Sequence, residues 1–181
     1  MPAHPHRLEM TVALASHPRA LVAGARRPRP DDLQALATLM LAAYQGTVDY
    51  TGESLYDAAQ EIAKTFAGGC GVFLAGYSYV VERESKLVSA SLVTRLEGRP
   101  LLAFTMTAPH WKRKGLAKAM IGNVMQDLFG AGETELQLAL HAKNQPALDL
   151  YLSLGFKELR RDACTLTLPE CRHTAGAGEA L

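Results

Sequence analysis

Apolar residues recur every three or four positions in three stretches of the chain, residues 33–44, 55–66 and 114–129. This spacing places apolar side chains on one face of a helix, so each stretch predicts an amphipathic helix. A fourth helix is expected after Asn144, because asparagine often caps a helix and Pro146 suits its first turn. The pattern therefore predicts four helices.

Capping residues mark where two of these helices begin. Ser54 with Asp57 has the spacing of a capping box, and Asp31 with Gln34 has a variant of it. Gly155 fits the C-terminal cap of the fourth helix. The starts and stops thus agree with the periodicity.

Between the second and third helices the apolar period changes to that of strands. We expect three strands there, at residues 77–82, 87–95 and 101–107, joined as an antiparallel meander. The turns of this meander are expected at residues 84–85 and 97–98. Further strands are expected at residues 19–27, 136–140, 156–159 and 165–168, with a possible extra strand at 8–15.

This mixed order of helices and strands predicts the α/β class, of the α+β type, with a mixed, mostly antiparallel central sheet flanked by helices. The 181 residues are enough for one domain with its own core. We place that domain at residues 19–168, between a flexible N-terminal extension (1–18) and a flexible C-terminal tail (169–181).

Composition excludes several classes of function. Hydrophobic residues make up 48% and charged residues 20% of the chain, as in ordinary globular proteins. The formal net charge of +1 gives no global field toward nucleic acid. No apolar run approaches the roughly 20 residues of a membrane span, so we expect a cytoplasmic protein. The cysteines have neither metal-ligand spacing nor a disulfide pattern, so no metal is expected; they are Cys70, Cys164 and Cys171.

A basic turn leads into the third helix, with Gly115 directly before its apolar stripe. Four cationic side chains surround this helix start: Lys112, Arg113, Lys114 and Lys118. A helix start offers unpaired N–H groups and the positive end of a dipole, so the turn predicts an anion site, for instance for a pyrophosphate. The alternative is an ordinary strand–turn–helix with a solvated basic rim.

Two motifs in this order resemble one known family. The spacing of Lys112, Gly115 and Ala117 after a proline resembles the acetyl-CoA signature of the GCN5-related N-acetyltransferases (GNAT family). Residues 144–156, with Asn, then Ala, then Leu-Tyr and a closing Gly-Phe, resemble the second signature of that family. The family usually has Arg or Gln where Lys112 stands, and a lysine meets a phosphate only as a point charge.

The resemblance covers roughly residues 20–168 and implies an acetyl-CoA-dependent N-acetyltransferase whose fourth and fifth strands splay apart around the thioester. The main chain of the turn would then cradle the CoA pyrophosphate, because Gly115 has no Cβ. The strand end at residues 105–107 would pair with the pantetheine arm. The expected cofactor contacts are Thr105, Met106, Thr107, Lys112, Arg113, Lys114, Gly115, Leu116, Ala117, Lys118, Asn144, Ala147 and Tyr151.

Tyr151 is the candidate proton donor to the leaving thiolate. The resemblance implies a tyrosine near the CoA sulfur at this position, and a phenol with a pKa near 10 is protonated at neutral pH. Helical geometry alone would instead pack the Tyr151 ring into the core. Both interpretations are open from the sequence.

The acceptor ammonium must lose a proton before it attacks, to a side chain or to water. Acidic and aromatic residues gather between the first two helices, so Glu53 is the candidate base, and Tyr44, Asp49 and Glu53 are the candidate acceptor contacts. Glu53 could also simply favour the start of the second helix. His141 and His110 are alternative bases.

The sequence therefore predicts direct attack of a primary amine, on a small molecule or a peptide terminus, on acetyl-CoA in a ternary complex. The alternative is a non-catalytic CoA-binding or acyl-CoA-binding sensor or interaction module of the same fold. Lys112 favours that alternative, whereas Tyr151 argues against it. No nucleic-acid or membrane partner is expected, and residues 165–168 could pair across a homodimer.

Overall fold

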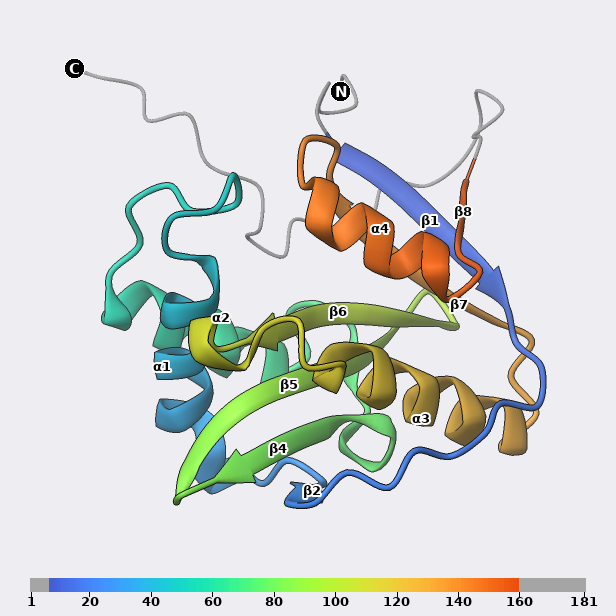
Figure 1. The fold of residues 1–181 in the computed structure, drawn as a ribbon, viewed down its shortest axis with the longest axis horizontal. Coiled ribbons are helices and arrows are strands. Elements are labelled where there is room, and N and C mark those ends of the chain that lie inside the picture. Colours follow the sequence, from blue (N-terminus) through green and yellow to red (C-terminus); the bar gives the residue numbers. More distant parts are fainter. Residues whose placement is uncertain (1–6, 160–181) are drawn as a thin grey trace.

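The four predicted helices are present in the computed structural model, which describes residues 7–159 (Figure 1). They are α1 (Leu33–Tyr44), α2 (Leu55–Phe66), α3 (Leu116–Gly130) and α4 (Gln145–Ser153). Three short 3-10 turns accompany them, η1 (Pro30–Asp32), η2 (Ala75–Tyr77) and η3 (Pro109–Trp111). None of the helices in the described range is long and apolar enough to cross a membrane.

A single sheet runs through the molecule in the spatial order β2-β4-β5-β6-β7-β1-β8, with β3 paired to β5. Its strands are β1 (Arg7–Ala13), β2 (Ala25–Arg26), β3 (Val72–Phe73), β4 (Tyr79–Arg83), β5 (Lys86–Leu96), β6 (Arg99–Thr107), β7 (Glu135–His141) and β8 (Lys157–Glu158). All the pairings are antiparallel except that of β6 with β7. The predicted fold class, a mixed and mostly antiparallel sheet flanked by helices, is confirmed.

The predicted meander is β4–β5–β6. Both of its hairpin turns have two residues in the left-handed region, which matches the right-handed twist of the flanking strands. The φ angles are +49° and +59° at Glu84 and Ser85, and +50° and +81° at Glu97 and Gly98. Only one of these four residues is a glycine, so the turns hold their conformation at some cost.

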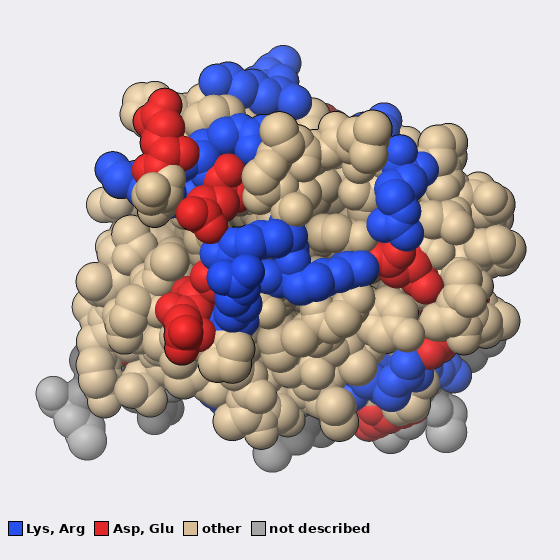
Figure 2. Space-filling model, turned by 90° about the horizontal axis from the view of Figure 1, so that it is seen from below, with Lys and Arg blue, Asp and Glu red and all other residues tan. Residues whose placement is uncertain are grey.

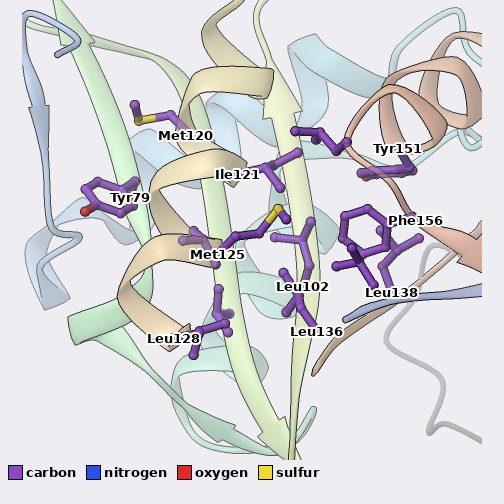
Figure 3. Close-up of a cluster of buried hydrophobic side chains, with 14 of the residues drawn as sticks. Tyr79, Leu102, Met120, Ile121, Met125, Leu128, Leu136, Leu138, Tyr151 and Phe156 are labelled. Carbon is purple, nitrogen blue, oxygen red and sulfur yellow. The ribbon is translucent and has the colours of Figure 1, made fainter. Parts of the chain in front are cut away.

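Two apolar cores lie on opposite faces of the sheet. One core joins α1 and α2 to alternate residues of the central strands, among them Val80, Leu92 and Phe104. The other joins α3 and α4 to the remaining residues of the same strands and to β1 and β7 (Figure 3). Because successive side chains of a strand point to opposite faces, one sheet can bury both of its faces.

One predicted capping pair is confirmed and one is wrong. The Ser54 hydroxyl accepts from the Asp57 N–H at 3.2 Å, and the Asp57 carboxylate accepts from the Ser54 N–H at 2.8 Å. Asp31 is exposed, however, and its neighbour Asp32 accepts from the Arg29 N–H at 2.7 Å. Pro30 starts a 3-10 turn just ahead of α1, so α1 begins one residue later than a cap at Asp31 predicts, and the Asp32 side chain bonds within the 3-10 turn.

The N-terminal part of the chain differs from the prediction. The extra strand that we considered at residues 8–15 is present as β1, which pairs with β7 along its whole length, so the sheet already begins within the expected extension. The strand expected at 19–27 is reduced to the two residues of β2. The strand expected at 165–168 lies outside the described residues.

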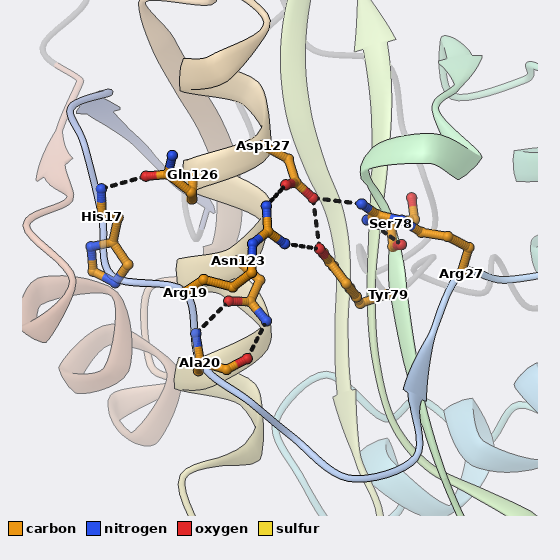
Figure 4. Close-up of polar contacts among 9 residues, drawn as sticks. All are labelled: His17, Arg19, Ala20, Arg27, Ser78, Tyr79, Asn123, Gln126 and Asp127. Atoms are coloured by element: carbon orange, nitrogen blue, oxygen red, sulfur yellow. Dashed lines mark hydrogen bonds and ion pairs between the residues drawn. The ribbon is translucent and has the colours of Figure 1, made fainter.

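The segment 14–24 lies along α3 instead of forming a strand (Figure 4). The Asn123 side chain takes both main-chain groups of Ala20, accepting from its N–H at 2.8 Å and donating to its carbonyl at 3.0 Å. The Gln126 side chain accepts from the His17 N–H at 2.6 Å. Because α3 satisfies these main-chain groups, the segment does not need a sheet partner.

A cluster of charged side chains fastens the same segment and β2 to the sheet. Asp127 of α3 accepts from Arg19, from Arg27 at 2.6 Å and from the Tyr79 hydroxyl at 2.6 Å (Figure 4). This face lies towards the bottom of Figure 1, and Figure 2 shows basic and acidic side chains next to one another on it. The charges therefore pair locally and leave no large surface of one sign here.

β6 and β7 diverge, as the resemblance implied. They are parallel and meet at one register position, Leu101 with Gln137. Just beyond it, the register of β6 against β5 shifts between Leu102 and Phe104, so Ala103 is the extra residue of a bulge. A bulge bends its strand and increases the twist, which turns the end of β6 away from β7. The gap opens toward Thr107 and His141, where the two strands end.

Cys70, which follows α2 in the sequence, is fully buried beside Thr65 of that helix. Cys164 and Cys171 lie outside the described residues.

Candidate active site

The turn before α3 leaves its main chain open. Arg113 and Gly115 have left-handed φ angles of +63° and +77°, and Gly115 directly precedes α3. Within residues 7–159, no side chain caps this helix start, and a Cβ placed on Gly115 would meet nothing within 4 Å. The first N–H groups of α3 thus face free space, which an anion site requires.

Of the basic side chains of the turn, Lys112 and Lys114 contact other parts of the protein, whereas Arg113 and Lys118 extend into solvent. The Lys112 ammonium donates to the Ala43 carbonyl at 2.9 Å, near the end of α1, and so is turned toward that helix. The Lys114 ammonium lies over the Trp111 ring, 4.5 Å from its centre. Arg113 and Lys118 are exposed. Lys112 thus bonds to a carbonyl in the last turn of α1.

The end of β6 lies beside the gap in the sheet. Met106 is buried against α1 and α2, whereas Thr105 and Thr107 are half-buried on the other side of the strand. The Thr105 carbonyl accepts from the Tyr44 hydroxyl at 3.2 Å. The Thr105 hydroxyl oxygen is buried and makes no hydrogen bond of ordinary geometry. Thr105 thus places a buried hydroxyl near Tyr151 at the open end of the strand.

Two tyrosines from helices on opposite faces of the sheet meet across this gap. Tyr44 ends α1, and Tyr151 lies on α4, where its ring also packs against Phe156 in the core, 5.6 Å between ring centres (Figure 3). Burial raises the pKa of Tyr151, and the nearby Thr105 hydroxyl acts in the opposite direction. The pKa of Tyr44 is raised by burial and then by the charge on Tyr151. Both phenols are therefore protonated at neutral pH.

Asp49 joins this group from the loop between α1 and α2. Its side chain accepts from the Asn144 amide at 2.5 Å, and only 8% of the residue is exposed. Burial raises the pKa of Asp49, while the Asn144 hydrogen bond and then His141 and Arg7 act to lower it. Asn144 also caps α4 by accepting from the Ala147 N–H at 3.2 Å, so one side chain serves both partners.

The other candidate bases lie differently. The Glu53 carboxylate accepts from the Thr51 N–H at 2.9 Å and from the Thr51 hydroxyl. His141 accepts on Nδ1 from the Lys143 N–H at 3.1 Å and lies near Asp49. His110 is exposed on η3. The structure thus brings Asp49, rather than Glu53, into contact with Asn144.

Sequence reasoning missed Arg7, which lies on β1 near Asp49. No motif could have signalled it, because Arg7 reaches the site only through the pairing of β1 with β7, which places it opposite His141. It also missed the Asp49–Asn144 contact, whose partners are 95 residues apart.

The residues present fit an acyl-CoA. The uncapped helix start can hold a pyrophosphate, and the side of β6 that turns away from β7 can pair with an amide-bearing arm. The fold, with its sheet open beside this helix start, is that of the acyl-CoA N-acyltransferases among solved structures. The chain belongs to the acetyltransferase (GNAT) family, whose model matches residues 52–156, and is thus an acetyl-CoA-dependent acetyltransferase.

Comparisons with individual proteins agree with this family. The [ribosomal protein bS18]-alanine N-acetyltransferase of Escherichia coli K12 is 26% identical over 118 residues, covering 59% of this chain and 78% of that protein. The peptidyl-lysine N-acetyltransferase YiaC of the same strain is 35% identical over 79 residues, covering 44% and 49% of the two chains.

The fold is similar to that of solved acetyltransferase structures. A GCN5-related N-acetyltransferase from Sphaerobacter thermophilus superposes with a TM-score of 0.66 at 16% identity, covering 84% of this chain. The match spans about half, 48%, of that longer chain. At this identity the likeness concerns the fold alone.

Proposed function

We propose that the chain transfers an acetyl group from acetyl-CoA to a primary amine, on a small molecule or a peptide terminus, by direct attack within a ternary complex. The observation that supports this most is the buried Asp49 carboxylate, which the Asn144 amide holds at 2.5 Å where the sheet opens, with Tyr151 close enough to respond to its charge. A proton donor and a buried carboxylate in one site suit a reaction that moves two protons.

The turn and the strand end would hold the donor. When bound, acetyl-CoA supplies an acetyl thioester as the electrophile. The N–H groups of residues 113–117 would bind its pyrophosphate, with Arg113 and Lys118 free to turn toward the phosphates. The main chain of residues 105–107 would pair with the pantetheine arm. Lys112, Lys114, Asn144 and Ala147 stay predicted contacts.

Tyr151 would give its proton to the departing thiolate. Burial keeps its pKa above the ordinary value, so the proton is present when it is needed. Tyr44, Asp49 and Glu53 lie on or next to the loop after α1 and would receive the acceptor. The same loop exposes Val48, with 47% of the residue in contact with solvent, so the acceptor can carry an apolar group beside its amine.

The named activities of the two bacterial relatives, on a protein alanine and on a protein lysine, support an amine acceptor within a polypeptide. A small-molecule amine is the other form of the same proposal. The cytoplasmic location, the domain limits and the homodimer stay predictions of the sequence.

Donor binding is tested by thermal unfolding of the purified protein with acetyl-CoA, CoA or ATP. A ligand bound only by the folded state stabilises it by about 2.7 kcal/mol at 100 times its dissociation constant. We expect the midpoint to rise with acetyl-CoA and CoA, but not with ATP. An unchanged midpoint with acetyl-CoA would contradict the proposal.

Catalysis is tested by mass spectrometry of peptides and diamines incubated with acetyl-CoA, using Tyr151→Phe and the matched control Tyr77→Phe. Loss of a general acid lowers the rate by about 10²- to 10⁴-fold. We expect Tyr151→Phe to show this loss while it still binds acetyl-CoA, and Tyr77→Phe, on the distant η2, to resemble wild type. A wild-type protein that binds acetyl-CoA but modifies no amine would favour the sensor alternative.

A further inference from the structure

The acceptor must lose a proton, and the structure distinguishes between the two carboxylates near the acceptor loop. The Glu53 carboxylate accepts two hydrogen bonds from Thr51, two residues away. Asp49 crosses to α4 and is buried there. Asp49 lies close enough to both tyrosines of the gap for its charge to affect them.

The loop is built to deliver Asp49 to this place. Thr47 folds the chain back, because its hydroxyl and its N–H both donate to the Tyr44 carbonyl, at 2.7 and 2.8 Å. The same hydroxyl accepts from the Asp49 N–H at 3.3 Å. The orientation of the Asn144 amide is fixed as well, since its oxygen caps α4 and its nitrogen must therefore face Asp49.

We propose that the Asp49 carboxylate binds the acceptor ammonium and takes its proton, with Asn144 as the residue that positions it. This rests on the acetyl transfer proposed above. The groups that face Asp49 come from four elements: His141 of β7, Arg7 of β1, Tyr44 of α1 and Tyr151 of α4. Their balance leaves the carboxylate a stronger base than an exposed aspartate.

The proton balance of the step is complete with these groups. Asp49 takes one proton from the ammonium, and the neutral nitrogen then forms a bond to the acetyl carbon as the carbon–sulfur bond breaks. The sulfur receives the Tyr151 proton, and the second proton of the nitrogen returns to Tyr151. Asp49 releases its proton to solvent, so one ammonium and one thioester give one amide, one thiol and one proton.

The test compares Asp49→Asn with the matched control Asp149→Asn, an exposed aspartate on α4 that bonds to Gln145. The Asp49→Asn substitution keeps the size of the side chain, and the oxygen of the new amide can still accept from Asn144. We expect kcat at saturating amine to fall by about 10²-fold or more and the acidic limb of the pH profile to vanish. Acetyl-CoA binding, measured by thermal shift, should stay as in wild type.

The variant Asn144→Ser tests the positioning role of Asn144 through the pH profile, which a purely structural role of Asn144 would leave unchanged. Serine can still cap α4 but does not reach Asp49. A hydrogen bond to a carboxylate favours its ionised form, so its loss raises the pKa of Asp49 and shifts the acidic limb upward by about half to one pH unit.

Three outcomes would overturn the proposal. In the first, Asp49→Asn raises only the KM for the amine and leaves kcat unchanged, which would make Asp49 a binding group alone. In the second, Glu53→Gln abolishes the acidic limb and Asp49→Asn does not. In the third, wild type modifies no amine at all, which overturns the proposed function together with this one.

Discussion

Asp127 on α3 accepts hydrogen bonds from three side chains that come from other parts of the chain, Arg19, Arg27 and Tyr79. We expect Asp127→Ala to lower the free energy of unfolding by about 3 kcal/mol. The variant removes a side chain that links α3 to three other parts of the chain (Figure 4). These are the segment 14–24, the residue that follows β2, and the strand β4.

The magnitude follows from how exposed each partner is. The Arg19 and Arg27 side chains are 50% and 40% exposed, so each pair contributes only about 0.5 kcal/mol after solvent screening. The Tyr79 residue is 7% exposed, and loss of the acceptor of its hydroxyl costs about 1–3 kcal/mol. For a domain of this size, a total near 3 kcal/mol lowers the melting temperature by about 6–12 °C.

The assay is denaturant unfolding followed by circular dichroism at pH 7 and near pH 3, with the exposed Asp149→Ala as control. Burial alone would raise the pKa of Asp127, but the hydrogen bonds from Tyr79, Arg27 and Arg19 outweigh it and lower that pKa. Its contribution is therefore complete above the unfolded pKa near 4 and fades as the pH falls through the lower folded value. If the free energies of unfolding of wild type and Asp127→Ala differed by the same amount at both pH values, the reasoning would be refuted.

Two further predictions concern helix ends. Gly115→Ala should lose about 1 kcal/mol of stability, because alanine is strained in the left-handed conformation of this residue, and should raise the KM for acetyl-CoA, because the new Cβ projects into the proposed pyrophosphate site. The control Gly130→Ala, at the other end of α3, should leave stability unchanged or raise it. Enzyme kinetics and thermal melts measure both variants, and equal effects of the two substitutions would contradict this prediction. Ser54→Ala should cost about 1 kcal/mol in a melt with acetyl-CoA binding unchanged, since it removes a helix cap, and a change below about 0.3 kcal/mol would count against it.

The helices and the central hairpins could be predicted because their signals are local. The apolar stripe of α3 and the capping box of Ser54 and Asp57 act over three or four residues, and the structure shows them where they were expected. The strand expected at 19–27 failed for the opposite reason. The segment lies along α3, and Asn123, over a hundred residues away, satisfies its main chain at Ala20.

The sequence indicated which residues belong to the candidate site better than it indicated which contacts they make. The basic turn at Gly115 and the tyrosine on α4 are visible as motifs. Lys112 looks like a phosphate ligand in the sequence, but its ammonium lies on the Ala43 carbonyl. Nothing local shows which of Asp49 and Glu53 is buried, because burial depends on where α4 packs.

The sequence by itself determined most of the secondary structure, the fold class and the two motifs of the family, since periodicity, capping and turn chemistry act between near neighbours. Only the tertiary structure decided how far β6 and β7 diverge, which tyrosines meet in the gap and which carboxylate Asn144 holds. These contacts join residues far apart in the chain. Their geometry follows from the packing of both faces of the sheet at once, which no local pattern encodes.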